Sequence, residues 1–370
     1  MKKTLVLAGG GHAHMQCLAS LEAFVSKGID VSVIGPSPHH YYSGMGPGML
    51  GQTYRPEDIR FATQHLVEKK GGTFIQGKVM KINATARTVT LESGKTITYD
   101  VLSCNLGSQV PKGMIQGPMN SIYPVKPIER LSDAQKQILC TGREKKITIG
   151  IVGGGPSAVE IAGNAWRLTQ MAGMTPADIQ ILTDAPLMPS HSKAVRHMAR
   201  ASLEKRGIRI RETSRIEKIK TNCVTETSGK THRLDIVFVA VGVKPSPVFS
   251  ASGIATGPDG GMRVNQFLQS IEHPNIFGGG DCVCFQDKPL DKVGVYAVRQ
   301  NPILFHNLMA ALEGKKLRPF LPGGGYLVIF NLGDGTGIFH KWRIRFTGRL
   351  AFLLKDHIDR KFMKKYQRFE

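Results

Sequence analysis

The chain has few of the features that define several common classes of protein. Six cysteines are spread over 370 residues, and no two of them form a CxxC pair or a zinc-ligand spacing. This excludes a disulfide scaffold, favours a reducing compartment and predicts no metal site. We interpret all six as small core residues: Cys17, Cys104, Cys140, Cys223, Cys282 and Cys284. No run approaches 18 uninterrupted apolar residues, so we expect no transmembrane helix. The glycines and histidines at 9–14 interrupt the first apolar run too early for a signal peptide.

Acidic residues are also scarce. The chain has 28 Asp and Glu against 49 Lys and Arg, which gives a formal net charge of +21. Residues 315–370 carry 13 of these basic residues and 4 acidic ones. A basic surface favours anionic partners such as lipid headgroups. No nucleic-acid recognition motif is present, so we do not expect a nucleic-acid partner.

Two glycine-rich loops each follow an apolar strand-like run and open a helix-like run. The first comprises residues 9–14, Gly-Gly-Gly-His-Ala-His, after a strand at 4–8. The second comprises residues 153–163 after a strand at 147–152, and a Gly-Gly-Gly-Asp motif ends at Asp281. Two such loops in one chain indicate two dinucleotide sites, and a flavin with a nicotinamide is the leading pair.

In the first loop, Gly9 permits the tight turn and Gly11 lets the backbone approach a pyrophosphate at the start of a helix predicted at 12–27. His14 stands where glycine or alanine is usual. No acidic residue follows the second strand, at 30–34, to bind a ribose. The alternative for this loop is an ordinary strand-to-helix turn.

In the second loop, Gly153, Gly155 and Ala158 fit the dinucleotide pattern before a helix at 156–171. Asp184 follows the next strand, at 179–183. There its carboxylate would accept a hydrogen bond from a ribose 2′-OH and repel a 2′-phosphate, which favours NADH over NADPH. The alternative is a turn or cap residue. Glu160 is a candidate to orient the nicotinamide carboxamide or to relay protons. The alternative is an ordinary glutamate on the solvent-facing side of the helix.

Asp281 is a candidate ligand of flavin ribityl hydroxyls. A helix N-cap is the other role open to it.

The fold class we predict is α/β, with two Rossmann-like domains and a basic C-terminal helical element. Residues 1–112 and 243–320 would form a discontinuous FAD domain, 113–242 an inserted NAD(H) domain, and 321–370 the terminal element. Smaller elements are expected as a functional loop at 35–56, a hairpin of 89–91 with 96–101, a crossover at 111–127, helices at 191–206 and 295–312, and strands at 208–211 and 235–242.

These motifs resemble the two-dinucleotide-binding-domain flavoproteins, the pyridine nucleotide-disulfide oxidoreductase superfamily. Within it the chain looks like the branch of type II NADH dehydrogenases and sulfide:quinone reductases. It looks closer still to the NADH-dehydrogenase-like proteins that are sometimes fused to selenophosphate synthase. The closer match is carried by 9–14, where His14 is normal for that group, and by 42–48, 296–300 and 355–363.

The resemblance implies FAD at Gly9, Gly11, His14, Gly44, Val79, Gly280 and Asp281, with the segment 42–48 running past the flavin ring. It implies NADH at Gly153, Gly155, Glu160, Asp184 and Gly242, the last within the motif 239–245. The segment 292–300 would approach the flavin from the acceptor side. Glu160 and Lys292 are therefore our candidates for residues that tune the flavin environment.

Departures from neighbouring branches matter as well. Residues 39–52 contain no cysteine, which argues against a dithiol relay of the disulfide-reductase kind. Residues 292–308 lack the cysteine that sulfide:quinone reductases use. Type II NADH dehydrogenases often have a glutamine-rich quinone motif after the Gly-Asp turn, and of that motif this chain has only Gln300.

The C-terminal tail has an apolar stripe at helical spacing, interspersed with lysines and arginines. The stripe comprises Leu350, Phe352, Leu353, Leu354, Ile358, Phe362, Met363 and Tyr366. Such a helix suits an anionic membrane interface or a homodimer contact, and the alternative is a helix packed on the flavin domain.

The function predicted from the sequence is a FAD-dependent oxidoreductase that takes hydride from NADH to the flavin N5 and passes two electrons to a quinone. We expect it in the cytoplasm, peripheral on the inner face of the membrane. Two alternatives stay open: flavin-dependent oxidation of sulfide or another sulfur or selenium compound, and a non-catalytic flavin redox sensor or docking protein.

Overall fold

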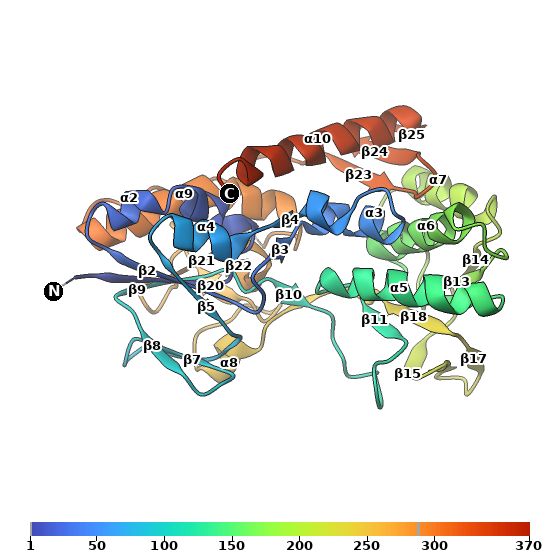
Figure 1. Cartoon of the computed structure of the whole chain (residues 1–370), viewed down its shortest axis with the longest axis horizontal. Coiled ribbons are helices and arrows are strands. Elements are labelled where there is room, and N and C mark those ends of the chain that lie inside the picture. Colours follow the sequence, from blue (N-terminus) through green and yellow to red (C-terminus); the bar gives the residue numbers. More distant parts are fainter. Residues whose placement is uncertain (1, 287–288) are drawn as a thin grey trace.

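Two five-stranded parallel sheets organise the chain (Figure 1), and the computed structural model describes residues 2–286 and 289–370. The first sheet has the order β21-β9-β1-β2-β5, from Ile276–Gly278, Val101–Cys104, Thr4–Ala8, Asp30–Gly35 and Thr73–Gln76. The second has the order β11-β18-β12-β13-β14, from Ile122–Pro124, Ile236–Val239, Thr148–Val152, Asp178–Leu182 and Arg209–Arg211. The predicted α/β class with two Rossmann-like sheets is confirmed.

The central strands are apolar along nearly their whole length because helices cover both faces of a parallel sheet. In β1, Leu5, Val6 and Leu7 are fully buried. Strand β1 lies between β2 and β9, and β12 lies between β13 and β18, each pair in parallel register. Both glycine loops therefore leave their sheets at the carboxyl edge where the strand order reverses, which is where such sheets bind ligands.

The helix of the second loop, α6, spans Pro156–Met171, as predicted. The helix of the first loop is not continuous, so the prediction of one helix at 12–27 was wrong. It divides into η1 (His12–His14), α1 (Met15–Ala19) and α2 (Glu22–Val25). The break falls at Ser20, whose φ of −119° and ψ of 33° lie outside the helical region and whose hydroxyl accepts from the Gln16 side chain at 2.9 Å.

Four other predicted elements change. The segment 35–56 is not a plain loop, since it contains β3 (His40–Tyr41), η2 (Ser43–Met45) and α3 (Gly46–Leu50). Residues 96–101 divide between β8 (Thr96–Thr98), the hairpin partner of β7 (Thr88–Leu91), and the start of β9. The crossover at 111–127 supplies β11 to the second sheet, while the strand predicted at 235–242 ends at Val239.

The other elements complete the two halves of the molecule, each of which is built around one of the five-stranded sheets. The helices are η3 (Pro56–Ile59), α4 (Thr63–Lys69), α5 (Glu129–Glu144), α7 (Lys193–Glu204), α8 (Val248–Ala251), η4 (Gly280–Cys282) and α9 (Gly294–Glu313). The strands are β4 (Arg60–Phe61), β6 (Val79–Asn83), β10 (Ser108–Gln109), β15 (Ile216–Lys220), β16 (Cys223–Glu226), β17 (Thr231–Arg233), β19 (Lys244–Pro245), β20 (Met262–Val264) and β22 (Val283–Phe285). Strands β10 and β19 pair antiparallel, so the two connections between the halves run side by side.

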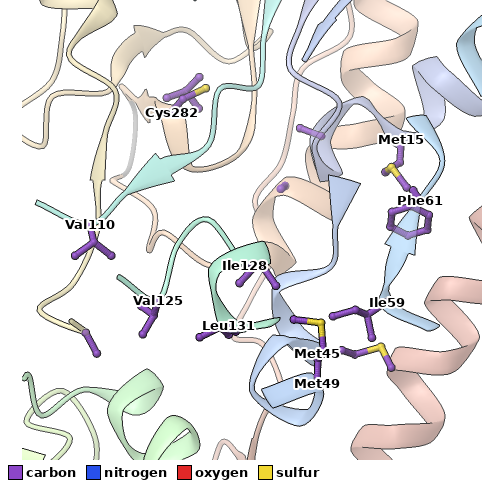
Figure 2. Close-up of a cluster of buried hydrophobic side chains, with 14 of the residues drawn as sticks. Met15, Met45, Met49, Ile59, Phe61, Val110, Val125, Ile128, Leu131 and Cys282 are labelled. Atoms are coloured by element: carbon purple, nitrogen blue, oxygen red, sulfur yellow. The ribbon is translucent and has the colours of Figure 1, made fainter. Parts of the chain in front are cut away.

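An apolar cluster joins the two halves (Figure 2). Met45 and Met49 from η2 and α3 lie beside Ile128 and Leu131 at the start of α5. A Cβ at Gly46 would stand 3.0 Å from Ile128, so glycine there lets α3 approach α5 closely. The segment that carries Gly44 is therefore fixed between the halves.

The last part of the chain is more than a helix. Strands β23 (Val328–Asn331), β24 (Gly337–Lys341) and β25 (Ile344–Gly348) form an antiparallel sheet. Helix α10 (Arg349–Gln367) follows and lies across both halves (Figure 1). No helix among the described residues is both long and apolar enough to cross a membrane.

Candidate dinucleotide and proton-transfer site

The two glycine loops are built on the same turn. Gly9 has a φ of +99° and its N–H donates to the Ile34 carbonyl at 2.8 Å; Gly153 has a φ of +118° and donates to Leu182 at 2.8 Å. A Cβ at Gly9 would overlap the Asn105 carbonyl, and a Cβ at Gly153 would overlap the Ala240 carbonyl. Both positions therefore require glycine twice over, for the left-handed φ and for the close approach.

Polar groups without partners surround the first loop. The buried atoms His12 Nε2, Thr63 Oγ1 and Asn105 Nδ2 have no hydrogen-bond partner among the described residues. A Cβ at either Gly11 or Gly280 would stand 2.8 Å from the Asn105 side chain. Buried polar atoms are normally satisfied, so these residues fit a group rich in oxygen and nitrogen acceptors and donors such as FAD.

His14 holds the first loop together from within. Its Nδ1 lies 2.6 Å from the Gly9 carbonyl and its Nε2 lies 2.7 Å from Ser103 Oγ on β9. Complete burial lowers the pKa of His14 to about 4, so the ring is neutral. Both ring nitrogens are occupied by the protein, which gives His14 a loop-shaping role, and its contact with FAD stays a prediction.

Asp281 does not cap a helix with its side chain. Its carboxylate accepts from Ser108 Oγ at 2.6 Å and from Lys126 Nζ at 2.9 Å, across the junction of the two halves. Burial works against ionisation, but Lys126 and Ser108 together hold the pKa of Asp281 below its ordinary value. Sequence reasoning missed Lys126, because the contact joins residues 155 apart and no motif marks the lysine.

The second loop leaves more open space. Gly155 precedes α6, and a Cβ there would meet no heavy atom within 4 Å among the described residues. Pro156 has no N–H and the Ala158 N–H donates to the Gly155 carbonyl at 3.0 Å, so within the described residues the Ser157 N–H is left to face an anion at this end of the helix. Asp184 is exposed just after β13, and Gly242, with a φ of +87°, follows β18. These placements suit the predicted NADH contacts, which stay predictions.

Of the remaining cofactor candidates, Val79 is buried at the start of β6, opposite Leu91. Its predicted backbone contact with the adenine stays a prediction.

Glu160 is largely enclosed and does not face solvent as an ordinary helix residue. Its Oε1 accepts from the Asn331 N–H at 2.8 Å, a bond between α6 and β23. Loss of hydration raises the pKa of Glu160 to about 7, against the opposing influence of Lys355 and Asn331. A carboxyl group of that pKa can hold or release a proton near neutral pH.

The charged groups that act electrostatically on Glu160 lie on α10. Lys355 Nζ donates to Asp359 Oδ2 at 2.6 Å and to the Gly44 carbonyl at 2.8 Å, and both charged residues are buried. Tyr42 OH donates to Asp359 Oδ1 at 3.0 Å. Burial alone would lower the pKa of Lys355, but Asp359 and Glu160 raise it above its ordinary value. The structure thus brings α6, the segment 42–48 and α10 to one polar cluster, which we call the Glu160 cluster.

Lys292 is held away from this cluster. Its Nζ lies 2.6 Å from Asp259 Oδ2 and donates to the Val283 carbonyl at 2.5 Å. With Gly280, Asp281, Tyr296 and Gln300 it lines a small hollow beside the Gly-Gly-Gly-Asp turn. Its role in tuning the flavin stays a prediction, and its contacts show a tether between β22 and the segment that leads to α9.

The cysteines agree only in part with the prediction of six core residues. Cys17, Cys104, Cys282 and Cys284 are buried, Cys223 is intermediate, and all are free thiols. Cys140 is exposed on α5, so that prediction was wrong for it, because the helix turns this position to solvent. Among the described residues no group of three or more His, Cys, Asp or Glu side chains is placed to hold a metal ion.

Two Rossmann-like sheets that each end in a glycine turn, joined through one polar cluster, define a two-dinucleotide oxidoreductase. The chain belongs to the pyridine nucleotide-disulphide oxidoreductase family, whose model matches residues 3–307. Binding of FAD and NAD(P)H is typical of this family.

Two curated relatives and one solved structure are similar to this chain. The chain is 26% identical to ferroptosis suppressor protein 1 of Taeniopygia guttata over 96% of this chain and 92% of the relative. It is 24% identical to a type II NADH:quinone oxidoreductase of Staphylococcus aureus over 97% and 94%. The sulfide:quinone oxidoreductase structure from Aquifex aeolicus superposes with a TM-score of 0.79 at 20% identity, covering 100% of this chain and 92% of that one.

The predicted superfamily is thereby confirmed. The closer placement, beside the proteins sometimes fused to selenophosphate synthase, stays a prediction.

Proposed function

We propose that the protein is a FAD-dependent NADH:quinone oxidoreductase. The observation that carries the proposal is the Glu160 cluster, where the helix of the second glycine loop meets the segment 42–48 and α10. The S. aureus relative named NADH:quinone oxidoreductase supports the same reaction. Asp184 favours NADH over NADPH, as the sequence predicts.

The balanced reaction is NADH, a quinone and one proton giving NAD⁺ and the quinol. FAD, when bound, supplies the two-electron relay between the two substrates. The residues of the chain must then deliver the extra proton and stabilise charge on the acceptor. Glu160, with a pKa of about 7, holds a proton that it can release. Lys355 stays cationic, so it attracts a quinone oxygen as negative charge develops on it.

The protein would take its acceptor from an anionic membrane on the cytoplasmic side, since a lipid-soluble quinone resides in the bilayer. A homodimer contact is the alternative use of the C-terminal element. Oxidation of sulfide would need a thiol beside the flavin, and Cys282 has a pKa that burial raises to about 11, which makes it a poor nucleophile.

The test is an anaerobic titration of the purified holoenzyme, followed by its visible flavin absorbance. NADH should bleach the flavin band and a soluble quinone should restore it. A flavin that ignores NADH but bleaches with sulfide would overturn the proposal, and one that reacts with neither would support a sensor.

The same measurement tests Glu160. We expect Glu160→Gln to slow reoxidation by quinone by roughly 10²-fold, as for a lost general acid, and to remove the pH dependence near 7. In the wild type the rate should fall as the pH rises through about 7, because the carboxyl loses its proton there. The exposed Glu92→Gln is the matched control. An unchanged pH profile in Glu160→Gln would remove this residue from the proton path.

A further inference from the structure

The two carboxylate oxygens of Asp281 have different surroundings. Oδ2 accepts from Ser108 Oγ at 2.6 Å and from Lys126 Nζ at 2.9 Å. Oδ1 accepts no hydrogen bond from the residues that the structure describes. Because each oxygen of a carboxylate can accept two hydrogen bonds, the protein occupies Oδ2 and leaves Oδ1 available to a ligand.

Asp281 lies beside the buried polar atoms around the first loop that lack partners. A Cβ at Gly280, its neighbour in the chain, would stand 2.8 Å from Asn105 Oδ1, and Nδ2 of the same amide has no partner among the described residues. The charges of Asp281 and Lys126 both act on His12, whose Nε2 also lacks a partner there. The open oxygen of Asp281 therefore belongs to the set of atoms that fits FAD.

Lys126 is anchored in the other half of the molecule. It follows β11, and the N–H of the preceding Val125 donates to the Val239 carbonyl at the end of β18 at 3.1 Å. Val125 and Ile128, on either side of Lys126, are buried (Figure 2). Asp281 in turn follows β21 of the first sheet. The ion pair therefore joins the carboxyl edges of the two sheets, where parallel sheets bind their ligands.

Lys126 also keeps the carboxyl group of Asp281 ionised. The side chain of Asp281 is only 13% exposed, and burial raises the pKa of its carboxyl group. Lys126 opposes burial most strongly, with Ser108 and Lys292 acting in the same direction, so the pKa lies below its ordinary value. An ionised carboxylate only accepts hydrogen bonds, whereas a protonated one also donates. The ion pair therefore keeps Oδ1 an acceptor, which suits a ligand rich in hydroxyl groups.

We propose that Lys126 is a positioning residue for FAD, which holds the Asp281 carboxylate so that Oδ1 is presented to the hydroxyl groups of the ribityl chain. The lysine acts through Asp281 and not through a contact of its own with the cofactor. The half that carries the second loop thereby supplies part of the FAD site. The inference rests on the proposed function in one respect, which is the choice of FAD as the cofactor.

The experiment measures how fast the purified holoprotein releases FAD after dilution, from the fluorescence of the free cofactor. Lys126→Met removes the ammonium group and keeps a long side chain. We expect it to release FAD roughly 10- to 100-fold faster than the wild type, as for a lost hydrogen bond to a charged group. Lys126→Arg keeps the charge and should stay within roughly threefold of the wild type. A wild-type release rate in Lys126→Met would overturn the proposal.

Lys112→Met is the matched control. It makes the same change on the same connection between the halves, at an exposed position. Its release rate should stay within roughly twofold of the wild type. A control that releases FAD as fast as Lys126→Met would overturn the proposal. Circular dichroism shows whether each variant is folded, and Lys126→Gln replaces Lys126→Met, with the same expectation, if the latter is not.

A double-mutant cycle shows whether Lys126 acts through Asp281. In an Asp281→Asn protein the carboxylate is already absent. Adding Lys126→Met to it should therefore change the release rate by less than roughly twofold. If the effects of the two substitutions multiplied instead, Lys126 would act on FAD independently of Asp281, and the proposal would be wrong.

The pH dependence separates this role from that of an ion pair that only joins the two halves. Without Lys126, burial meets less opposition and the pKa of Asp281 moves upward. The release rate of Lys126→Met, divided by that of the wild type, should therefore rise as the pH is lowered from about 8 to about 5, because the carboxyl group takes up a proton. Other titratable groups near Asp281, namely His12, Lys292 and Cys282, are the same in both proteins. A ratio that does not change with pH would overturn the proposal.

Release of FAD needs neither NADH nor a quinone, so this inference and the proposed function can fail separately. The expected release rates in a protein whose flavin ignores NADH and quinone would refute the proposed function alone. A wild type that reduces quinone, together with unchanged FAD release in Lys126→Met, would refute the role of Lys126 alone.

Discussion

At the scale of single residues, Gly153 and Gly155 of the second loop have different roles. A Cβ at Gly153 would overlap the Ala240 carbonyl, whereas one at Gly155 meets only open space in the described structure. We expect Gly153→Ala to lower stability by about 1–3 kcal/mol, through strain of the kind seen when a packed site is overfilled. Gly155→Ala should keep wild-type stability and raise the KM for NADH, since the methyl would stand where the pyrophosphate approaches.

Thermal unfolding and steady-state kinetics of the two purified variants distinguish these roles. Equal loss of stability in both would show that the open space at Gly155 is not reserved for a ligand. A normal KM in Gly155→Ala would argue against dinucleotide binding at this loop.

At the scale of elements, α6 is joined to the C-terminal sheet at Gly163. A Cβ there would overlap the Leu332 carbonyl, and Arg206 donates to the same oxygen at 2.5 Å. Gly163→Ala should therefore destabilise the protein by roughly 1–3 kcal/mol, although alanine is the better helix former. Gly294→Ala in α9 is the matched control, because a Cβ there would meet no heavy atom of the described residues within 4 Å, so alanine should be neutral or stabilising.

Chemical denaturation with both variants measures this contact. A Gly163→Ala protein as stable as Gly294→Ala would mean that the C-terminal sheet can move away from α6. In that event the bond between Asn331 and Glu160 would not fix the carboxyl group in place.

At the scale of the whole molecule, acid should loosen the half that carries the first loop. Burial lowers the pKa of His12 and His14 to about 4 and of His40 to about 3. These rings are neutral when folded, while the unfolded chain takes up protons below about pH 6.5. Their contribution to stability is therefore complete above pH 6.5 and is lost as the pH falls toward 4.

Glu160 acts in the opposite direction over part of this range, because its raised pKa favours the folded state at lower pH. Comparing the unfolding free energies of the wild type and a His14 variant separates the contribution of His14 from that of Glu160. Between pH 7.5 and 5.5 the unfolding free energy of the wild type should fall by about 1 kcal/mol more than that of His14→Asn. The exposed His357→Asn should follow the wild type. Parallel pH profiles for wild type and His14→Asn would contradict the assignment of a buried neutral ring.

The sequence by itself determined the parts of this protein that are encoded locally. The strands β1 and β12, the turns at Gly9 and Gly153 and the bounds of α6 follow from apolar runs and from positions that only glycine can fill. Asp281 was found for the same reason, since three glycines place it at the end of a strand. The continuous helix at 12–27 failed because Ser20 breaks it, a local detail that periodicity does not register.

Only the tertiary structure decided what the charged groups meet. Tyr42 and Asp359 are 317 residues apart in the chain, and Asn331 and Glu160 are 171 apart. The tertiary structure also decided which apolar residues of α10 are buried: Met363 and Tyr366 are, whereas Leu350 and Leu353 of the same apolar pattern are exposed. Periodicity shows that a helix has an apolar face, but the choice between protein and solvent depends on which distant surface the folded chain brings against that face.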